Sequence, residues 1–177
     1  IGIFNFYLDQ YKFLNSTNSI SLPNGGNDFS FSYEVSPYSS TYIYIRYFNE
    51  SKEVLELYDL ENIIVDKNVQ KLRADLQFTV HKNLQLKSRI ELIGLNQISN
   101  NENGILLFQD AKLRIGKYFS IYGRIIFFET DSYATRIYEF ENDLTGIMNN
   151  QPLWGSGVKW YLLFKYKPIY NLRISAK

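Results

Sequence analysis

The stretch that decides the fold is KLRADLQFTVHKNLQLKSRIEL, residues 71–92, in which apolar and polar side chains alternate through two successive runs. A period of two is typical of β-strands, because successive side chains point to opposite faces of a sheet. Residues opposite each other in an antiparallel pair share a face, so a continuous apolar set across both runs requires a loop of odd length. We place that loop at residues 81–83 and expect Asn83 to adopt a left-handed conformation.

This register puts Asp75 opposite Arg89 and Arg73 opposite Glu91, although only apolar residues were used to choose it. The same rule predicts three more hairpins, with loops at 36–38, 116–118 and 167–169. In those hairpins Asp28 is predicted to face Arg46, Asp110 to face Arg124, and Lys159 to face Lys177.

Composition narrows the classes of protein. The 177 residues suffice for one domain, and Lys+Arg 19 against Asp+Glu 18 gives no basic excess, so we predict no nucleic-acid partner. Cysteine is absent, which excludes disulfides and thiolate metal ligands. No apolar run is long enough for a transmembrane helix, whereas aromatics at 17% favour strands, and barrel strands need only about 10 alternating residues.

Long polar connections, at 15–27, 49–68, 95–104 and 130–156, alternate with the tight turns. This asymmetry is typical of outer-membrane barrels with short periplasmic turns and long extracellular loops. Residues 49–68 alternate poorly and are predicted to form a short helix or a hairpin in an outer loop.

The fold predicted is therefore all-β, an antiparallel up-and-down transmembrane β-barrel of about nine to ten strands, forming a single domain over 1–177. Bacterial single-chain barrels usually have an even strand number, so we expect the chain to be a piece of a longer protein. The strands are expected at 1–14, 28–36, 39–48, 69–81, 84–94, 105–116, 118–129, 157–166 and 169–177.

If the apolar face meets lipid, the charged face lines a lumen. Its ion pairs would then fix the register between neighbouring strands. The predicted lumen network is Arg73, Asp75, Arg89, Glu91, Asp110, Arg114 and Arg124. The stretch RIYEFEND begins at Arg136 and places Glu139, Glu141 and Asp143 on one side of the chain. It is predicted to be either an external, solvated loop or a plug that folds into the lumen against Arg89, Arg114, Arg124 or Arg136.

The sequence contains few residues in arrangements typical of catalytic, metal or phosphate sites. The one histidine, His81, lies in a predicted turn without a second imidazole, and the glycine runs lack phosphate-binding spacings. We therefore predict no enzyme activity, no metal and no cofactor.

Three stretches resemble a known family: LRADLQFTVHKNLQLKSRIEL, GILLFQDAKLRIGKYFSIYGRIIFFETDSYATRIYEFENDL and GSGVKWYLLFKYKP, within residues 70–177. They are similar to the C-terminal outer-membrane β-barrel region of Bacteroidota helix-hairpin-helix, competence-like proteins. The helix-hairpin-helix part and the terminal strand closing with Phe do not occur in this sequence, so a DNA-uptake role is not implied.

The function expected is that of a non-enzymatic integral outer-membrane β-barrel of a Gram-negative bacterium, a porin-like channel or a structural subunit of an envelope complex. Its partners would be the lipid bilayer with lipopolysaccharide and other outer-membrane proteins. The alternative is a soluble β-barrel or β-sandwich that binds an apolar ligand or a protein, because alternation alone does not reveal which face meets water.

Overall fold

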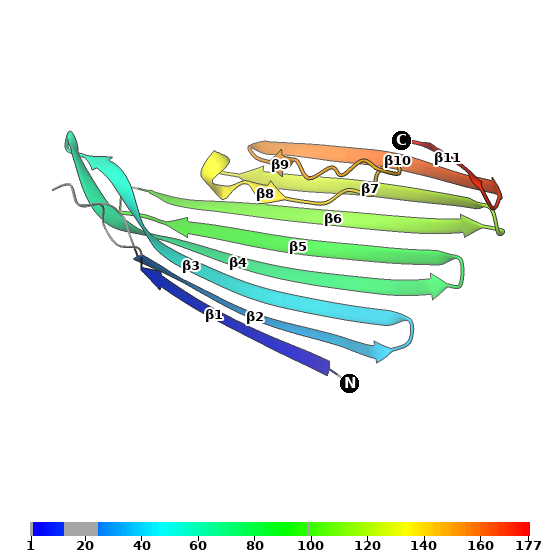
Figure 1. Ribbon diagram of the computed structural model, residues 1–177, viewed down its shortest axis with the longest axis horizontal. Coiled ribbons are helices and arrows are strands. Elements are labelled where there is room, and N and C mark those ends of the chain that lie inside the picture. Colours follow the sequence, from blue (N-terminus) through cyan, green and yellow to red (C-terminus); the bar gives the residue numbers. More distant parts are fainter. Residues whose placement is uncertain (1, 13–24, 99) are drawn as a thin grey trace.

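The computed structural model describes residues 2–12, 25–98 and 100–177 and consists mainly of one large antiparallel sheet. Nine strands lie side by side in chain order, which confirms the all-β, up-and-down arrangement (Figure 1). A small ribbon of two strands, β8 and β9, is separate from this sheet. The strands of the large sheet are β1 (Gly2–Lys12), β2 (Gly25–Tyr38), β3 (Thr41–Tyr58), β4 (Glu61–His81), β5 (Leu84–Asn96), β6 (Asn101–Ile115), β7 (Phe119–Thr130), β10 (Ser156–Ile169) and β11 (Leu172–Ala176).

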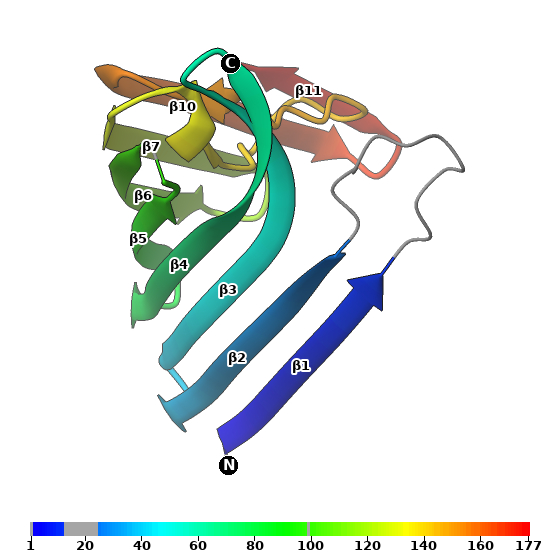
Figure 2. The same cartoon turned by 90° about the vertical axis from the view of Figure 1, so that its left-hand side faces the viewer.

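The sheet is strongly curled. Seen from one end it forms an open C, and the connection between β7 and β10 lies on its inner side (Figure 2). Over the described ranges, β1 pairs only with β2 and β11 only with β10, so these strands form an open sheet and not a closed barrel. The part of the chain that the structure describes contains no helix with the length and apolarity needed to cross a membrane.

The registers of two hairpins are as predicted. Asp75 faces Arg89 across β4 and β5, and Asp110 faces Arg124 across β6 and β7. The predicted loop at 116–118 is confirmed, and Gly116 adopts φ +63°, a left-handed conformation that suits glycine.

Three of the predicted turns were wrong in detail. Next to His81 the ladder shifts by one residue, the turn is 82–83, and Asn83 is not left-handed. The other two hairpins turn later, at 39–40 and 170–171, with irregular pairing around Pro37 and Pro168. Consequently Asp28 faces Glu50 instead of Arg46, and Lys159 does not face Lys177.

Two predicted long connections are also shorter than expected. The segment 49–68 is a hairpin that extends β3 and β4, one of the two forms predicted, and its turn residues Asp59 and Leu60 both have positive φ. β5 and β6 likewise extend into the predicted connection 95–104, because β5 ends at Asn96 and β6 begins at Asn101. The connection at 15–27 lies mostly outside the described residues.

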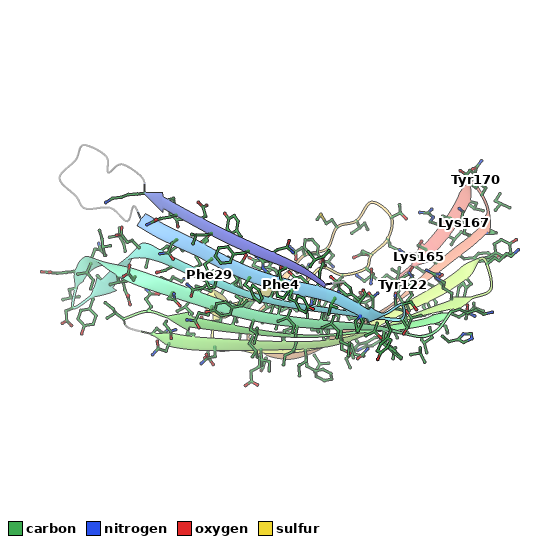
Figure 3. All side chains as sticks on the ribbon, turned by 90° about the horizontal axis from the view of Figure 1, so that it is seen from below. Phe4, Phe29, Tyr122, Lys165, Lys167 and Tyr170 are labelled. Atoms are coloured by element: carbon green, nitrogen blue, oxygen red, sulfur yellow. The ribbon has the colours of Figure 1, made fainter. Side chains whose placement is uncertain are left out.

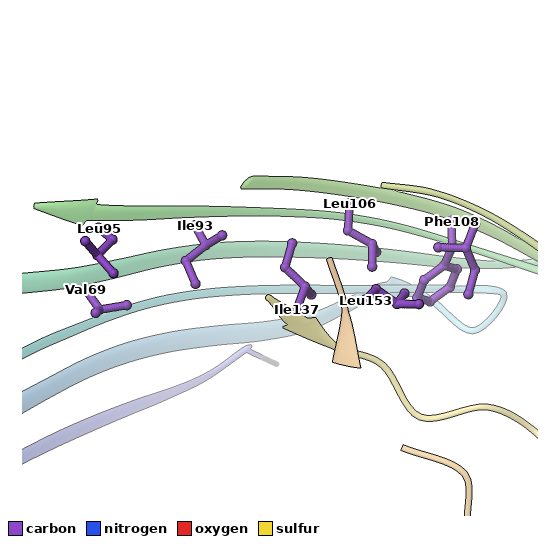
Figure 4. Packing of buried hydrophobic residues seen from close by; sticks show 8 residues of the cluster. Val69, Ile93, Leu95, Leu106, Phe108, Ile137 and Leu153 are labelled. Carbon is purple, nitrogen blue, oxygen red and sulfur yellow. The ribbon is translucent and has the colours of Figure 1, made fainter. Parts of the chain in front are cut away.

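The two faces of the sheet differ sharply. The outer face is apolar and largely exposed, with 68% of Phe4 and 70% of Trp160 accessible. The inner face carries the charged residues and, farther from the turns at 82–83 and 116–118, an apolar cluster. Figure 4 shows that Ile137 and Leu153, on the connection between β7 and β10, pack onto this cluster. Its sheet members are Val69, Ile93, Leu95, Leu106, Phe108 and Ile126.

We expect Gly104→Ala to loosen the connection from the sheet. A Cβ at Gly104 would lie 2.7 Å from a methyl of Ile93 and 3.0 Å from the carbonyl oxygen of Thr135, so overpacking should lower the free energy of unfolding by about 1–3 kcal/mol. Urea denaturation followed by tryptophan fluorescence measures this. Gly94→Ala is the matched control, because its Cβ would meet only Asn103 Oδ1 at 3.7 Å. Equal effects of the two substitutions would contradict the packing described here.

Candidate functional site: the inner face and the segment that covers it

The candidate site lies where the connection between β7 and β10, residues 131–155, lies against the inner face of the sheet. We call this connection the inner segment. It contains a short 3-10 helix, η1 (Tyr133–Thr135), and the ribbon formed by β8 (Ile137–Tyr138) and β9 (Pro152–Leu153). Glu139 follows β8 directly and points its carboxylate at the sheet.

Glu139 joins two arginines from different strands. One carboxylate oxygen accepts from Arg89 Nη1 at 2.5 Å, and the other accepts from Arg124 Nη1 at 3.0 Å. Each arginine already holds an aspartate through two donors: Arg89 holds Asp75, and Arg124 holds Asp110. Three carboxylates and two guanidinium groups thus form one connected network. Of the two alternatives predicted for the stretch that contains Glu139, the structure has the one in which it folds against Arg89 and Arg124.

Most of this network is buried, and Lys87 brings its three cations into balance with the three carboxylates. The exposed fractions are 6% for Asp75, 7% for Arg124 and 5% for Glu139, and Lys87 Nζ lies 3.5 Å from Asp75. Buried charges are tolerated when each is paired and hydrogen-bonded, a condition that this arrangement meets. Phe108 lies between the arginines, with its ring centroid 4.1 Å from Arg124 Cζ and 5.2 Å from Arg89 Cζ, which adds cation–π attraction.

The start of the inner segment is fixed by hydrogen bonds and close packing. Ser132 caps η1 by accepting from the backbone N–H of Ala134, and its hydroxyl donates to Glu102 on β6. The backbone N–H of Asn103 donates to Asp131 at 2.6 Å, and Thr135 is completely buried. Polar caps and the apolar contacts of Ile137 and Leu153 therefore hold the same segment.

A second set of ion pairs holds the later part of the inner segment. Glu141 accepts from Lys159 on β10 at 2.5 Å and from Lys177 at 2.8 Å, and Lys177 also donates to Asp143. Burial alone would raise the pKa of Glu141, but the two lysines outweigh it and hold that pKa below its usual value. The Lys177 hydrogen bond likewise lowers the pKa of Asp143.

Of the residues singled out in the sequence, nearly all take part in these contacts. Glu91 accepts from Arg73 Nε at 2.9 Å, completing the cross-strand pairs that the register predicted. Arg114 is the exception: it is exposed and forms no ion pair within the described ranges. Arg136 meets no carboxylate there, and its guanidinium donates to the Tyr138 hydroxyl and the Tyr133 carbonyl instead.

Several participants were missed by sequence reasoning. Lys87, Lys159 and Lys177 have carboxylate partners, and Phe108 separates the arginines. The signal for Phe108 was available, because it stands two residues from Asp110 on one strand and so shares its face. The pairing of Lys159 and Lys177 through Glu141 depends on the path of the inner segment, which alternation does not encode.

A pocket of about 560 Å³ lies between the network and the turns at 82–83 and 116–118. Polar and cationic side chains line it, including Gln77, Gln85, Lys87 and Lys112. At this end the Nζ atoms of Lys112 and Lys165 each lie 5.2 Å from the ring centroid of Tyr122. Figure 3 shows Tyr122 and Lys165 in this region. The inner segment thus covers the apolar part of the inner face, whereas a pocket is present where the inner face is polar and cationic.

The arrangement offers charged groups and hydrogen-bond donors. The carboxylates Asp75, Asp110 and Glu139 each accept hydrogen bonds from guanidinium donors. Within the described ranges, no cluster of three or more histidine, aspartate or glutamate side chains could hold a metal ion. Comparison of the chain with protein-family models, with curated proteins and with solved structures found no match. The resemblance to the Bacteroidota family therefore stays a prediction.

We expect Glu139→Gln to release part of the inner segment. The amide keeps the shape of the side chain but removes the negative charge that Arg89 and Arg124 share. The free energy of unfolding should therefore fall by about 1–3 kcal/mol. Limited proteolysis should at the same time cut within 131–155 faster than in the parent protein. The control is Glu129→Gln, an exposed position without an ion pair among the described residues. An unchanged cleavage rate would show that the network does not hold the segment.

The lowered pKa of Glu141 predicts an acid-dependent loss of stability. Because the folded-state pKa lies below the unfolded one, ionised Glu141 stabilises the fold above about pH 4.3, and this contribution disappears as the pH falls through the folded-state pKa. The difference in unfolding free energy between the parent and Glu141→Gln should be largest near about pH 6 and shrink toward about pH 3. A difference independent of pH would contradict the ion pairs with Lys159 and Lys177.

Proposed function

We propose that the protein is a non-enzymatic integral outer-membrane β-barrel protein in which the outer face meets lipid and the inner face lines the lumen. The observation that carries this proposal is the inverted distribution of side chains. Apolar residues cover the exposed convex face, whereas Asp75, Glu91, Arg124 and Glu139 are buried on the concave side. Water-soluble proteins bury apolar side chains and rarely bury charge, so this sheet suits a bilayer better than water.

The size of the apolar face supports the same proposal. Burying one large apolar side chain contributes about 1.5–3 kcal/mol, and the outer face exposes many of them. Left in water, these side chains would contribute little to the stability of the fold, whereas covering the face would add a favourable contribution on the order of tens of kcal/mol. A bilayer covers such a face continuously around the curve of the sheet. The apolar side chains exposed on that face include Phe4, Phe6, Leu8, Leu72, Leu76, Ile90, Leu107, Ile125, Phe127, Trp160 and Leu162.

In this proposal the inner segment is a plug or a constriction. It occupies the concave side, and both polar and apolar contacts fix it there, so it would narrow any conducting path along the inner face. Unpaired backbone groups are costly in lipid, so further strands are needed beside β1 and β11 to close the wall. The protein would then act as a narrow channel or as a structural subunit of an envelope complex.

A soluble β-barrel or β-sandwich that binds an apolar ligand or a protein remains the second candidate function. The exposed outer face favours it, because a partner could cover that face in place of lipid. The two candidates differ in what the outer face touches in the cell.

The proposal predicts opposite environments for adjacent residues of β4. We expect a nitroxide spin label at Leu76→Cys, on the outer face, to collide mainly with oxygen dissolved in lipid. A label at Gln77→Cys, which lines the pocket on the inner face, should collide mainly with a water-soluble nickel chelate. The measurement uses the whole protein in native outer membranes. Equal accessibility at both sites, or extraction of the protein by carbonate, would overturn the membrane assignment.

A further inference from the structure

A second pocket, of about 200 Å³, lies between the inner segment and strands β3, β4 and β5. Four cationic side chains line it: Arg46, Lys71, Arg73 and Arg136. Glu91 is its one carboxylate among the lining residues, and both contacts that Glu91 makes are with Arg73, at 2.8 Å and 2.9 Å. The pocket therefore holds more positive charge than its own residues neutralise.

The strand register concentrates this charge. Arg46 on β3 is directly opposite Arg73 on β4, and like charges in that position repel each other. Arg46, Lys71 and Arg136 form no ion pair among the described residues, although Glu91 and Glu50 lie near enough to attract Lys71. Phe48 partly compensates, since its ring centroid lies 5.5 Å from Arg46 Cζ and 5.8 Å from Lys71 Nζ, but a ring carries no net charge.

Arg136 is held in place without being neutralised. It donates to the Tyr138 hydroxyl at 2.8 Å and to the Tyr133 carbonyl at 2.9 Å, and the Tyr133 ring lies 4.3 Å from its Cζ. These are neutral acceptors, so the charge of the guanidinium persists, and the group has five N–H donors in all. A fixed guanidinium with spare donors is suited to binding an oxyanion.

We propose that this pocket binds a compact oxyanion of the phosphate or sulfate class. Arg46, Lys71 and Arg136 come from β3, β4 and the inner segment, so an anion between them would relieve the repulsion and link the segment to the sheet. The volume suits a small group, and Phe48, Ile93 and Ile137 form the apolar part of the lining. This inference goes beyond the proposed function and does not depend on contact of the outer face with lipid.

The test is isothermal titration calorimetry of the whole purified protein with inorganic phosphate, at constant ionic strength in chloride. Saturable binding at one site is expected. Because hydrogen bonds to charged groups are strong, Lys71→Gln and Arg136→Gln should each weaken the affinity roughly tenfold or more. Lys71 lies on a strand, so its substitution tests the site even if Arg136→Gln loosens the inner segment.

The matched control is Lys112→Gln, which removes another inner-face lysine without a carboxylate partner among the described residues, outside this pocket. It should change the affinity less than about twofold, since a screened charge at a distance contributes little. A parallel titration with a lipid phosphomonoester in the same detergent distinguishes a free anion from a lipid headgroup. No saturable binding of either ligand, or equal weakening by all three substitutions, would overturn the proposal.

Discussion

The structure depends on two guanidinium groups that the sheet places on its concave face. Arg89 and Arg124 come from different strands, and burying them requires compensating negative charge. Their register partners Asp75 and Asp110 supply part of it, and Glu139 supplies the rest from a distant part of the chain. With Lys87 beside Asp75, three cations and three carboxylates balance. The path of the inner segment follows from this balance, because Glu139 can reach both arginines only if the chain folds back inside the sheet.

This balance also explains how one sheet presents two unlike faces. On the inner face, pairing and the inner segment bury Asp75, Glu91, Arg124 and Glu139, whereas the outer face carries mainly apolar side chains. In a water-soluble sheet the same alternation would be oriented the opposite way, with Arg73 and Glu91 solvated and Leu76 buried. The inner segment lies on the charged side of the sheet and leaves the apolar side uncovered.

Much of the fold could be predicted from alternation alone, and the errors have a common physical reason. Parity assigns each residue to a face, but shifting a hairpin by an even number of residues preserves every face. The β4–β5 and β6–β7 registers were predicted correctly, and the opposite-charge pairs that they imply are formed. The β2–β3 and β10–β11 registers were wrong because loops centred on Pro37 and Pro168 preserve the same faces as the observed turns. Both prolines instead lie where the ladder is irregular, a position where a missing N–H is tolerated.

The path of the inner segment could not be derived from parity, yet the sequence marks where it docks. At residues 105–108 and 125–128 alternation gives way to continuous apolar runs, so the inner face is apolar there as well as the outer face. Leu106 and Ile126 within these runs are completely buried beneath the inner segment. Nearer the turns alternation is strict, and there the inner face stays polar and open. The break in alternation thus marks where the inner segment packs on the apolar cluster. Strict alternation marks the part of the sheet that lines the pocket. The same face can therefore hold the segment firmly at one end and keep a cationic, water-accessible pocket at the other.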